Sequence, residues 1–144
     1  MSSPQKEVFT DFLCFRLAAI TRRINRYYNN RYADYGITVG QSFVLFHLLD
    51  NDGSSVKEIA SRVQLDSPAL TGIIDRLVRE ELVERREDPE DRRSLRISLT
   101  LKGRKLAAEV LTIAQEYNEQ IIDLIKPENL EAFRRSIARL EEGL

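Results

Sequence analysis

The chain has 144 residues, of which 42% are hydrophobic and 31% are charged, a balance typical of a folded globular protein rather than a disordered one. No run approaches the roughly 18 apolar residues of a membrane span, and the start MSSPQKEVF lacks the pattern of a secretory signal. With a single cysteine, we expect no disulfide within the chain and a reducing, cytoplasmic location. The formal net charge is -1, so binding to nucleic acid would require positive charge gathered on one face.

The first third of the chain has helical periodicity. From Phe9 onward, apolar residues recur every three or four positions, which predicts one long helix ending near Gly36. Thr38, followed three residues later by Gln41, forms a capping box that begins a second helix. The turn-forming cluster at 50–53 is expected to end that helix.

The middle of the chain predicts two helices separated by a tight turn. Ser55 and Glu58 form a second capping box and begin a short helix. Residues 64–66 separate it from a helix predicted over Ser67–Glu81, with the Ser67 hydroxyl as its cap and Pro68 at its first helical position. An apolar stripe on this helix faces inward, which leaves small and polar residues outward: Pro68, Ala69, Thr71, Gly72, Asp75, Arg76 and Arg79.

The periodicity then changes to that of β-strands. Apolar and polar residues alternate over 95–99, and 82–86 can supply the partner strand of a hairpin. The polar segment Glu87–Arg93 between them is expected to be an exposed loop. Helical periodicity returns from Thr100, and Pro127 divides the remaining chain into two helices.

This order of elements predicts a mostly α fold with a small β-hairpin, arranged as a winged helix-turn-helix. We expect an N-terminal dimerisation helix over 1–36, a winged helix-turn-helix DNA-binding domain over 37–100, and C-terminal dimerisation helices over 101–144. The apolar faces of the two end regions find no counterpart in so small a chain. A second copy of the chain is therefore the natural partner for them.

The outer face of the predicted helix 67–81 suits the major groove of DNA. A reading helix must be small enough to approach the base edges and polar enough to bond them. Ala69 and Gly72 are small, Ser67 and Thr71 offer hydroxyls, and Arg76 can reach a guanine or a phosphate. The alternative is an ordinary surface helix that follows a turn.

Two adjacent arginines lie in the predicted hairpin loop. Arg92 and Arg93 follow Asp91, which is close enough to orient one of them. An arginine on a protruding hairpin can enter the minor groove, where negative potential is concentrated. The alternative is a solvated turn whose acids and arginines balance each other.

The segment from Val56 to Gly103 resembles the MarR family of bacterial and archaeal regulators, most specifically in DPEDRRSLRISLT followed by Lys102-Gly103. The resemblance implies a homodimeric regulator, commonly a repressor, whose end helices interlock and whose winged domains straddle a pseudo-palindromic operator in double-stranded DNA. It also implies that Arg93 enters the minor groove with Asp91 as its orienting partner. By position, the residues that would face the major groove are Ser67, Ala69, Thr71, Gly72 and Arg76.

The segment around Cys14 resembles the N-terminal helix of the OhrR branch of this family, which senses organic hydroperoxides through a cysteine. Tyr28 matches one of the tyrosines that hold the reactive thiol, whereas Ala18 stands where the other would be. On one straight helix Cys14 and Tyr28 would be about 21 Å apart, so they could meet only across a dimer. The alternative is that Cys14 is a small core residue.

Four tyrosines cluster near the end of the first helix: Tyr27, Tyr28, Tyr32 and Tyr35. The family resemblance implies that a small aromatic ligand binds between the dimer helices and the winged domain, where aromatic side chains would suit it. Core packing at the dimer interface is the alternative, which we favour for at least two of the four.

The sequence contains none of the common catalytic or metal-binding motifs that we looked for. His47 is the single histidine and there is one cysteine, so one chain cannot build a zinc site of the usual kind. We find no GxSxG, P-loop or dinucleotide-binding glycine motif. We therefore expect no enzymatic activity and no cofactor. A winged-helix module for protein–protein contact, without DNA binding, remains the alternative function.

Overall fold

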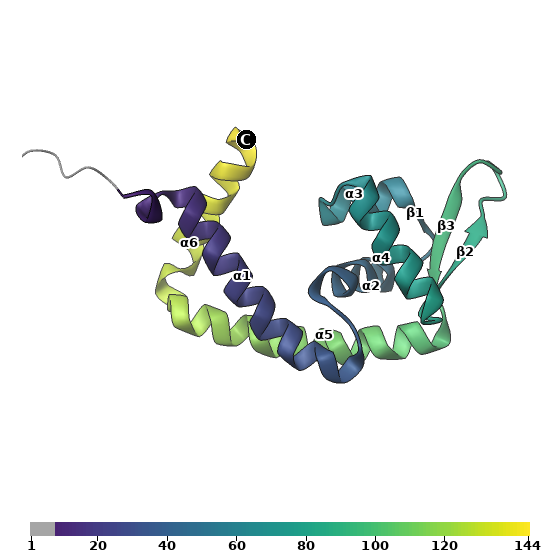
Figure 1. Cartoon of the computed structure of the whole chain (residues 1–144), viewed down its shortest axis with the longest axis horizontal. Helices are drawn as coiled ribbons and strands as arrows, with labels where there is room; N and C mark the ends of the chain where they lie inside the picture. The colour runs from purple at the N-terminus through teal and green to yellow at the C-terminus, as the bar shows by residue number, and fades with distance from the viewer. Residues whose placement is uncertain (1–7) are drawn as a thin grey trace, which may run out of the picture.

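The computed structural model describes residues 8–144, and it consists mainly of helices with one small sheet (Figure 1). This confirms the predicted mostly α, winged-helix fold class. None of the described helices is long and apolar enough to cross a membrane. The elements in chain order are η1 (Phe9–Asp11), α1 (Leu13–Tyr32), η2 (Ala33–Tyr35), α2 (Val39–Asp50), β1 (Ser54–Ser55), α3 (Val56–Val63), α4 (Ser67–Arg79), β2 (Val83–Glu87), β3 (Leu95–Leu99), α5 (Leu101–Ile125) and α6 (Pro127–Gly143).

The chain has a compact part and an extended part. Figure 1 shows α2, α3, α4 and the sheet gathered at one end, with the β2–β3 hairpin projecting beyond them. The long helix α5 runs from this part toward the other end, where α1 and α6 extend away from it. The first part corresponds to the predicted winged helix-turn-helix.

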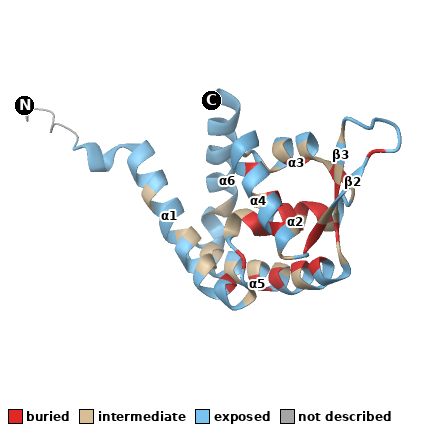
Figure 2. Cartoon of the chain, turned by 45° about the vertical axis from the view of Figure 1, so that its right-hand side comes forward, coloured by how far each residue is buried: buried red, intermediate tan, exposed pale blue. Residues whose placement is uncertain are grey.

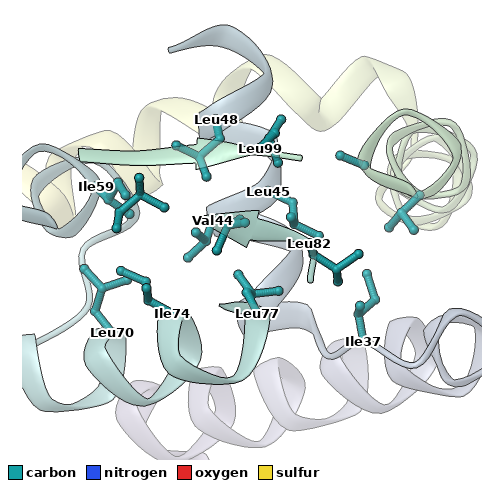
Figure 3. Packing of buried hydrophobic residues seen from close by; sticks show 14 of the residues in the cluster. Ile37, Val44, Leu45, Leu48, Ile59, Leu70, Ile74, Leu77, Leu82 and Leu99 are labelled. Atoms are coloured by element: carbon teal, nitrogen blue, oxygen red, sulfur yellow. The ribbon is translucent and has the colours of Figure 1, made fainter. Parts of the chain in front are cut away.

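The core lies where α2, α3, α4 and the sheet meet (Figures 2 and 3). Leu70, Ile74 and Leu77 of α4 are buried, as the predicted inward stripe requires. They pack with Val44, Leu45 and Leu48 of α2 in the same cluster. Burying each such side chain stabilises the fold by about 1.5–3 kcal/mol. This packing fixes which face of α4 is left outward.

The sheet contains a strand that the sequence analysis did not predict. Its order is β1-β3-β2, and both pairings are antiparallel. Strand β1 is only the pair Ser54–Ser55, which lies opposite Ile97 and Arg96 of β3. The predicted hairpin strands are otherwise close to those observed, with β3 at 95–99 and β2 displaced by one residue from 82–86.

Most of the predicted helix boundaries hold, with three corrections. Thr38 and Gln41 form the predicted capping box, and Gly36 takes the left-handed conformation at φ 70° where the first helical segment ends. However, α1 begins at Leu13 rather than Phe9, because Phe9 belongs to the separate turn η1. Helix α4 stops at Arg79 rather than Glu81, since Glu81 has a φ of 61°, outside the helical region.

The third correction concerns the cap of α4. The sequence predicted Ser67 as the cap, but Asp66 occupies that position and its side chain accepts a hydrogen bond from the Ala69 amide. Ser67 is instead the first helical residue, and Pro68 follows it in the first turn. Proline is still tolerated there because the amides of the first turn have no partner within the helix.

The two ends of the chain expose apolar side chains. Leu13, Leu17 and Ile20 of α1 are 47–69% exposed. Phe133, Ile137 and Leu140 of α6 are 40–44% exposed in the single chain. Water-exposed apolar stripes on helices are the pattern expected of a surface that another chain covers.

Candidate DNA-binding surface

Helix α4 presents an outer face made of the residues that the sequence singled out. Its inner stripe is held in the core, so the remaining positions point away from the molecule. All the predicted major-groove residues are exposed: Ser67, Ala69, Thr71, Gly72 and Arg76. All five therefore lie on the solvent-exposed part of one helix.

This outer face is polar, and most of its side chains are short. The Thr71 hydroxyl donates to the Ser67 carbonyl over 2.8 Å, so its methyl group and oxygen lie close to the helix. A Cβ placed on Gly72 would have no atom within 4 Å, which means that the space above this residue is open. Arg76 Nε lies 3.5 Å from Glu80 Oε1, but exposed pairs of this kind contribute little and exchange readily. Arg76 is thus available to another partner.

The second part of the surface is the wing, which we define as β2, β3 and the loop 88–94 between them. Asp91, Arg92 and Arg93 lie in this loop and are all exposed. Asp91 Oδ1 accepts a hydrogen bond from the Arg93 backbone amide over 3.0 Å. Asp91 therefore contacts Arg93 through the main chain of that arginine.

Two residues of the wing that sequence reasoning missed lie at its base. Asp88 is only 9% exposed, and its Oδ1 accepts from the Glu90 amide over 2.9 Å. Its Oδ2 is 3.1 Å from Arg96 Nη2 of β3. The bond from the Glu90 amide, followed by that from Arg96, lowers the pKa of the Asp88 carboxyl, against the opposing effect of burial. The signal in the sequence was the Asp-Pro pair that opens the loop.

The wing and α4 are also joined directly. Arg85 of β2 forms an ion pair with Asp75 of α4, and this was a second contact that the sequence did not reveal. The two residues are 10 positions apart on different elements, so no local pattern couples them. The pair links the strand at the base of the wing to the helix that carries the small outer face.

The ion pairs of this region show which arginines are held by acids. In this region Glu80 pairs with Arg76, Glu84 with Arg86, Asp75 with Arg85 and Asp88 with Arg96. None of the ion pairs formed within residues 8–144 uses Arg79, Arg92 or Arg93. The arginines at the tip of the wing and near the end of α4 are therefore not held in ion pairs within the described residues.

The predicted sensor pair lies elsewhere. Cys14 is exposed near the start of α1, and Tyr28 is half-buried near its end. The Tyr28 hydroxyl donates to the Ala114 carbonyl over 3.4 Å, and burial, followed by the neighbouring Tyr27, raises the Tyr28 pKa. Because both residues belong to one helix, they are about 21 Å apart within a chain. The fold does not bring them together without a second copy.

The tyrosines near the end of α1 pack largely against one another. The ring of Tyr117 on α5 lies 4.5 Å from that of Tyr27 and 5.5 Å from that of Tyr28, and Tyr28 is 5.8 Å from Tyr32. These contacts favour core packing for three of the four predicted tyrosines. Tyr35 differs, since it lines a cavity of about 470 Å³ together with Lys102 and Lys105 among other residues.

Within residues 8–144, no group of three His, Cys, Asp or Glu side chains is placed to hold a metal ion. His47 is buried, and its ring nitrogens contact Ser54 and Arg62. This histidine belongs to the packing of α2 rather than to the surface formed by α4 and the wing.

Comparison with known proteins relates this fold to a family. Residues 37–95 match the MarR family model. The chain is 34% identical to the uncharacterized HTH-type transcriptional regulator YsmB of Bacillus subtilis, over 89% of this chain and 86% of the relative. It is 31% identical to the HTH-type transcriptional regulator SarZ of Staphylococcus epidermidis, over 82% and 80% of the two chains.

Solved structures share the fold over nearly the full length. The transcriptional repressor CouR, bound to a 23-mer DNA duplex, has a TM-score of 0.83 and 26% identity, covering 97% of this chain and 99% of CouR. The Staphylococcus aureus MepR–DNA complex has a TM-score of 0.87 at 22% identity, covering 92% and 98%, which is a likeness of fold. This chain belongs to the MarR family of HTH-type transcriptional regulators.

Proposed function

We propose that the protein is a homodimeric, sequence-specific DNA-binding regulator that represses transcription from a pseudo-palindromic operator and acts in the cytoplasm. The observation that carries this proposal is the joint exposure of the α4 outer face and the arginine tip of the wing, both attached to one buried core. CouR and MepR, which share this fold, are DNA-bound in their structures.

In this proposal α4 enters the major groove. The groove is about 12 Å wide and admits a helix whose outer residues are small. Ala69 and the open space at Gly72 allow close approach, while Ser67, Thr71 and Arg76 supply hydrogen-bonding groups for base edges or phosphates. Contacts to base edges would give the sequence preference.

The wing enters the adjacent minor groove. Arg92 and Arg93 take part in none of the ion pairs formed within residues 8–144, so their guanidinium groups are available to a partner. The narrow minor groove concentrates negative potential, which attracts such side chains. Asp91 contributes by holding the Arg93 backbone rather than by touching DNA.

A second copy of the chain covers the apolar faces of α1 and α6. Two winged parts related by a two-fold axis would then read two half-sites on one duplex, so the symmetry of the operator follows from that of the protein. Binding of DNA and of a partner accounts for the exposed polar and apolar surfaces without catalysis, and His47, the single histidine, is buried. We therefore propose that the protein is not an enzyme.

Release from the operator would follow binding of a small effector. BpsR, a structural neighbour, is described as regulated in its DNA binding by 6-hydroxynicotinic acid, and PcaV was solved with its natural ligand. For this chain the two effector classes to compare are a small aromatic ligand and an organic hydroperoxide acting on the exposed Cys14. If an organic hydroperoxide abolishes DNA binding, if a thiol restores that binding, and if Cys14→Ser prevents the loss, then the effector is the hydroperoxide.

Substitution of Arg93 tests the proposal. The operator is first obtained by selecting bound duplexes from a random pool, and affinity is then measured by fluorescence anisotropy. We expect Arg93→Ala to weaken binding at least about tenfold, and to reduce the salt slope by about one for each subunit, while sedimentation still shows a dimer. The control is Arg139→Ala, which removes the same charge from α6, distant from the wing (Figure 1). Equal affinities for Arg93→Ala and the parent protein would contradict the assignment of the wing.

A further inference from the structure

The side chain of Arg96 connects two parts of the chain that are distant in sequence. Its Nη1 donates to the Gly53 carbonyl over 2.8 Å, and its Nη2 is 3.1 Å from Asp88 Oδ2. Gly53 belongs to the turn before β1, and Asp88 is the first residue of the wing loop. One guanidinium therefore bridges the body of the domain and the base of the wing.

Asp88 in turn organises the loop. Its Oδ1 accepts from the Glu90 amide, its own amide donates to the Ser94 carbonyl over 3.1 Å, and its carbonyl accepts from the Asp91 amide. The two carboxylate oxygens thus have separate tasks, one facing the loop backbone and the other facing Arg96. A carboxylate that accepts a backbone amide and a guanidinium makes two charge-assisted bonds, which are the stronger class.

The position of Arg96 in the sheet explains why such a bridge is needed there. Ser55 of β1 pairs with Arg96, and this is the last β1 pairing toward the wing. Beyond it only β2 and β3 continue, pairing Glu87 with Leu95. Arg96 therefore stands where a three-stranded sheet becomes a two-stranded ribbon, and an isolated two-stranded ribbon is only marginally stable in water.

From these observations we propose that Arg96 and Asp88 are positioning residues for DNA recognition, a conclusion that rests on the proposed function. They hold the wing in one orientation, so that Arg92 and Arg93 reach the minor groove without a further cost of ordering the loop. Ordering a flexible segment on binding lowers affinity, and fixing it beforehand avoids that loss. Neither positioning residue needs to touch DNA.

The most discriminating variant is Asp88→Asn. Removing a negative charge near DNA should strengthen binding by electrostatics alone. The proposal predicts the opposite, a loss of about tenfold, because the weakened bridge releases the wing. The matched control is Glu90→Gln in the same loop: the Glu90 side chain takes part in none of the ion pairs of residues 8–144, so this variant should bind as tightly as the parent or more tightly.

A second variant separates positioning from direct phosphate contact. Arg96→Lys keeps the charge but cannot bridge Gly53 and Asp88 at once, so positioning predicts a loss similar to that of Asp88→Asn, whereas a phosphate contact would be largely retained. In a background that carries both Arg92→Ala and Arg93→Ala, Arg96→Lys should have little further effect, because it acts through the wing arginines. Additive losses would indicate that Arg96 contacts DNA itself.

All variants are compared for operator affinity, thermal unfolding, dimer sedimentation and amide hydrogen exchange of residues 88–94. We expect an unchanged dimer, faster exchange confined to the wing, and weaker DNA binding in Asp88→Asn and Arg96→Lys. Parent-like affinity in both variants, or unchanged exchange in the wing, would overturn the inference. If Arg93→Ala also binds like the parent, the proposed function of the wing fails; if only Arg93→Ala loses affinity, the positioning role alone fails.

Discussion

Gly72 and Gly103 are both helical glycines, but a side chain would meet different surroundings at the two positions. A Cβ at Gly72 has nothing within 4 Å, whereas at Gly103 it would lie 1.8 Å from the Leu82 carbonyl oxygen. Gly103 is therefore required by the close approach of α5 to the chain entering β2. Gly72 has no such structural requirement, which is consistent with a role in approaching a partner.

This contrast predicts opposite effects on stability. We expect Gly72→Ala to raise stability by up to about 1 kcal/mol, since alanine is the better helix former. Gly103→Ala should lower it by at least about 2 kcal/mol, because the backbone must move apart. Thermal and urea unfolding measure the stability of both variants. Gly72→Leu should keep the thermal stability and lose operator binding, and tight binding by that variant would contradict the placement of α4 in the groove.

The cap of α4 gives a second prediction at this scale. Asp66→Ala should cost about 1 kcal/mol of unfolding free energy, because the Ala69 amide loses its acceptor. Ser67→Ala is the control and should leave stability nearly unchanged, since Ser67 is already inside the helix. Urea unfolding of the two variants in parallel compares them. The reverse ranking would restore Ser67 as the cap.

The sequence could not decide between these two caps. Aspartate and serine are similarly favoured at that position, and proline is tolerated in either register of the first turn. The deciding factor was the conformation of the preceding turn, in which Gln64 has a φ of 55° and ends α3. The outer residues of α4 were nevertheless predicted, because the apolar stripe that buries Leu70 and Leu77 also defines the opposite face.

At the scale of elements, His47 joins α2 to β1 and α3. Its Nε2 lies 2.8 Å from Ser54 Oγ, which itself donates to the Asn51 carbonyl, so the ring is assigned a proton on Nε2. Its Nδ1 is then free to accept from Arg62 Nη1 at 3.5 Å. Burial, followed by the Arg62 charge, lowers the His47 pKa below its usual 6.5, against opposing effects of Glu58 and Asp50.

This geometry predicts destabilisation by acid. A histidine whose pKa is lowered on folding contributes its stabilisation fully above the unfolded value of 6.5, and the contribution is lost as the pH falls from there toward the folded pKa. We expect the urea midpoint to decrease over this range and His47→Gln to show a smaller decrease. Identical pH profiles for the parent and His47→Gln would show that another group is responsible.

The elements differed in how well the sequence revealed them. Helix α2 was predicted from its capping box, α5 from its helical periodicity and β3 from its alternation. Strand β1 has only two residues, so it has no period, and it depends on pairing with residues 96–97, about forty positions later. The bridge from Gly53 through Arg96 to Asp88 was missed for the same reason, since it forms only after that pairing.

At the scale of the whole molecule, the apolar faces of α1 and α6 predict a stable dimer. Ile137 is 40% exposed in the single chain, so Ile137→Glu should have little effect on the fold of the winged part but should place charges in the dimer interface. We expect this variant to sediment as a monomer at micromolar concentration. Arg135→Glu, which introduces the same residue on α6, is the control and should remain dimeric. A dimeric Ile137→Glu protein would contradict this interface.

The sequence of one chain does not show which surface covers the apolar faces of the end helices. Periodicity predicted that the end helices have apolar faces. Phe133 and Ile137 are exposed on such a face, because the surface that would cover them is not part of one chain. The assignment of 37–100 to DNA binding, and of the two end regions to dimerisation, therefore remains a proposal that concerns the assembled molecule.

The proposed function requires sequence-specific DNA binding by a two-fold symmetric regulator. Its test is selection of duplexes from a random pool, followed by anisotropy titration of the selected duplex and a scrambled duplex across salt. We expect a pseudo-palindrome with half-sites about one helical turn apart or a multiple of it, an affinity at least about 10³-fold above that for the scrambled duplex, and a steep loss with salt. Weak, equal binding to both duplexes with no enriched sequence would contradict the claim and favour a winged-helix module for protein–protein contact.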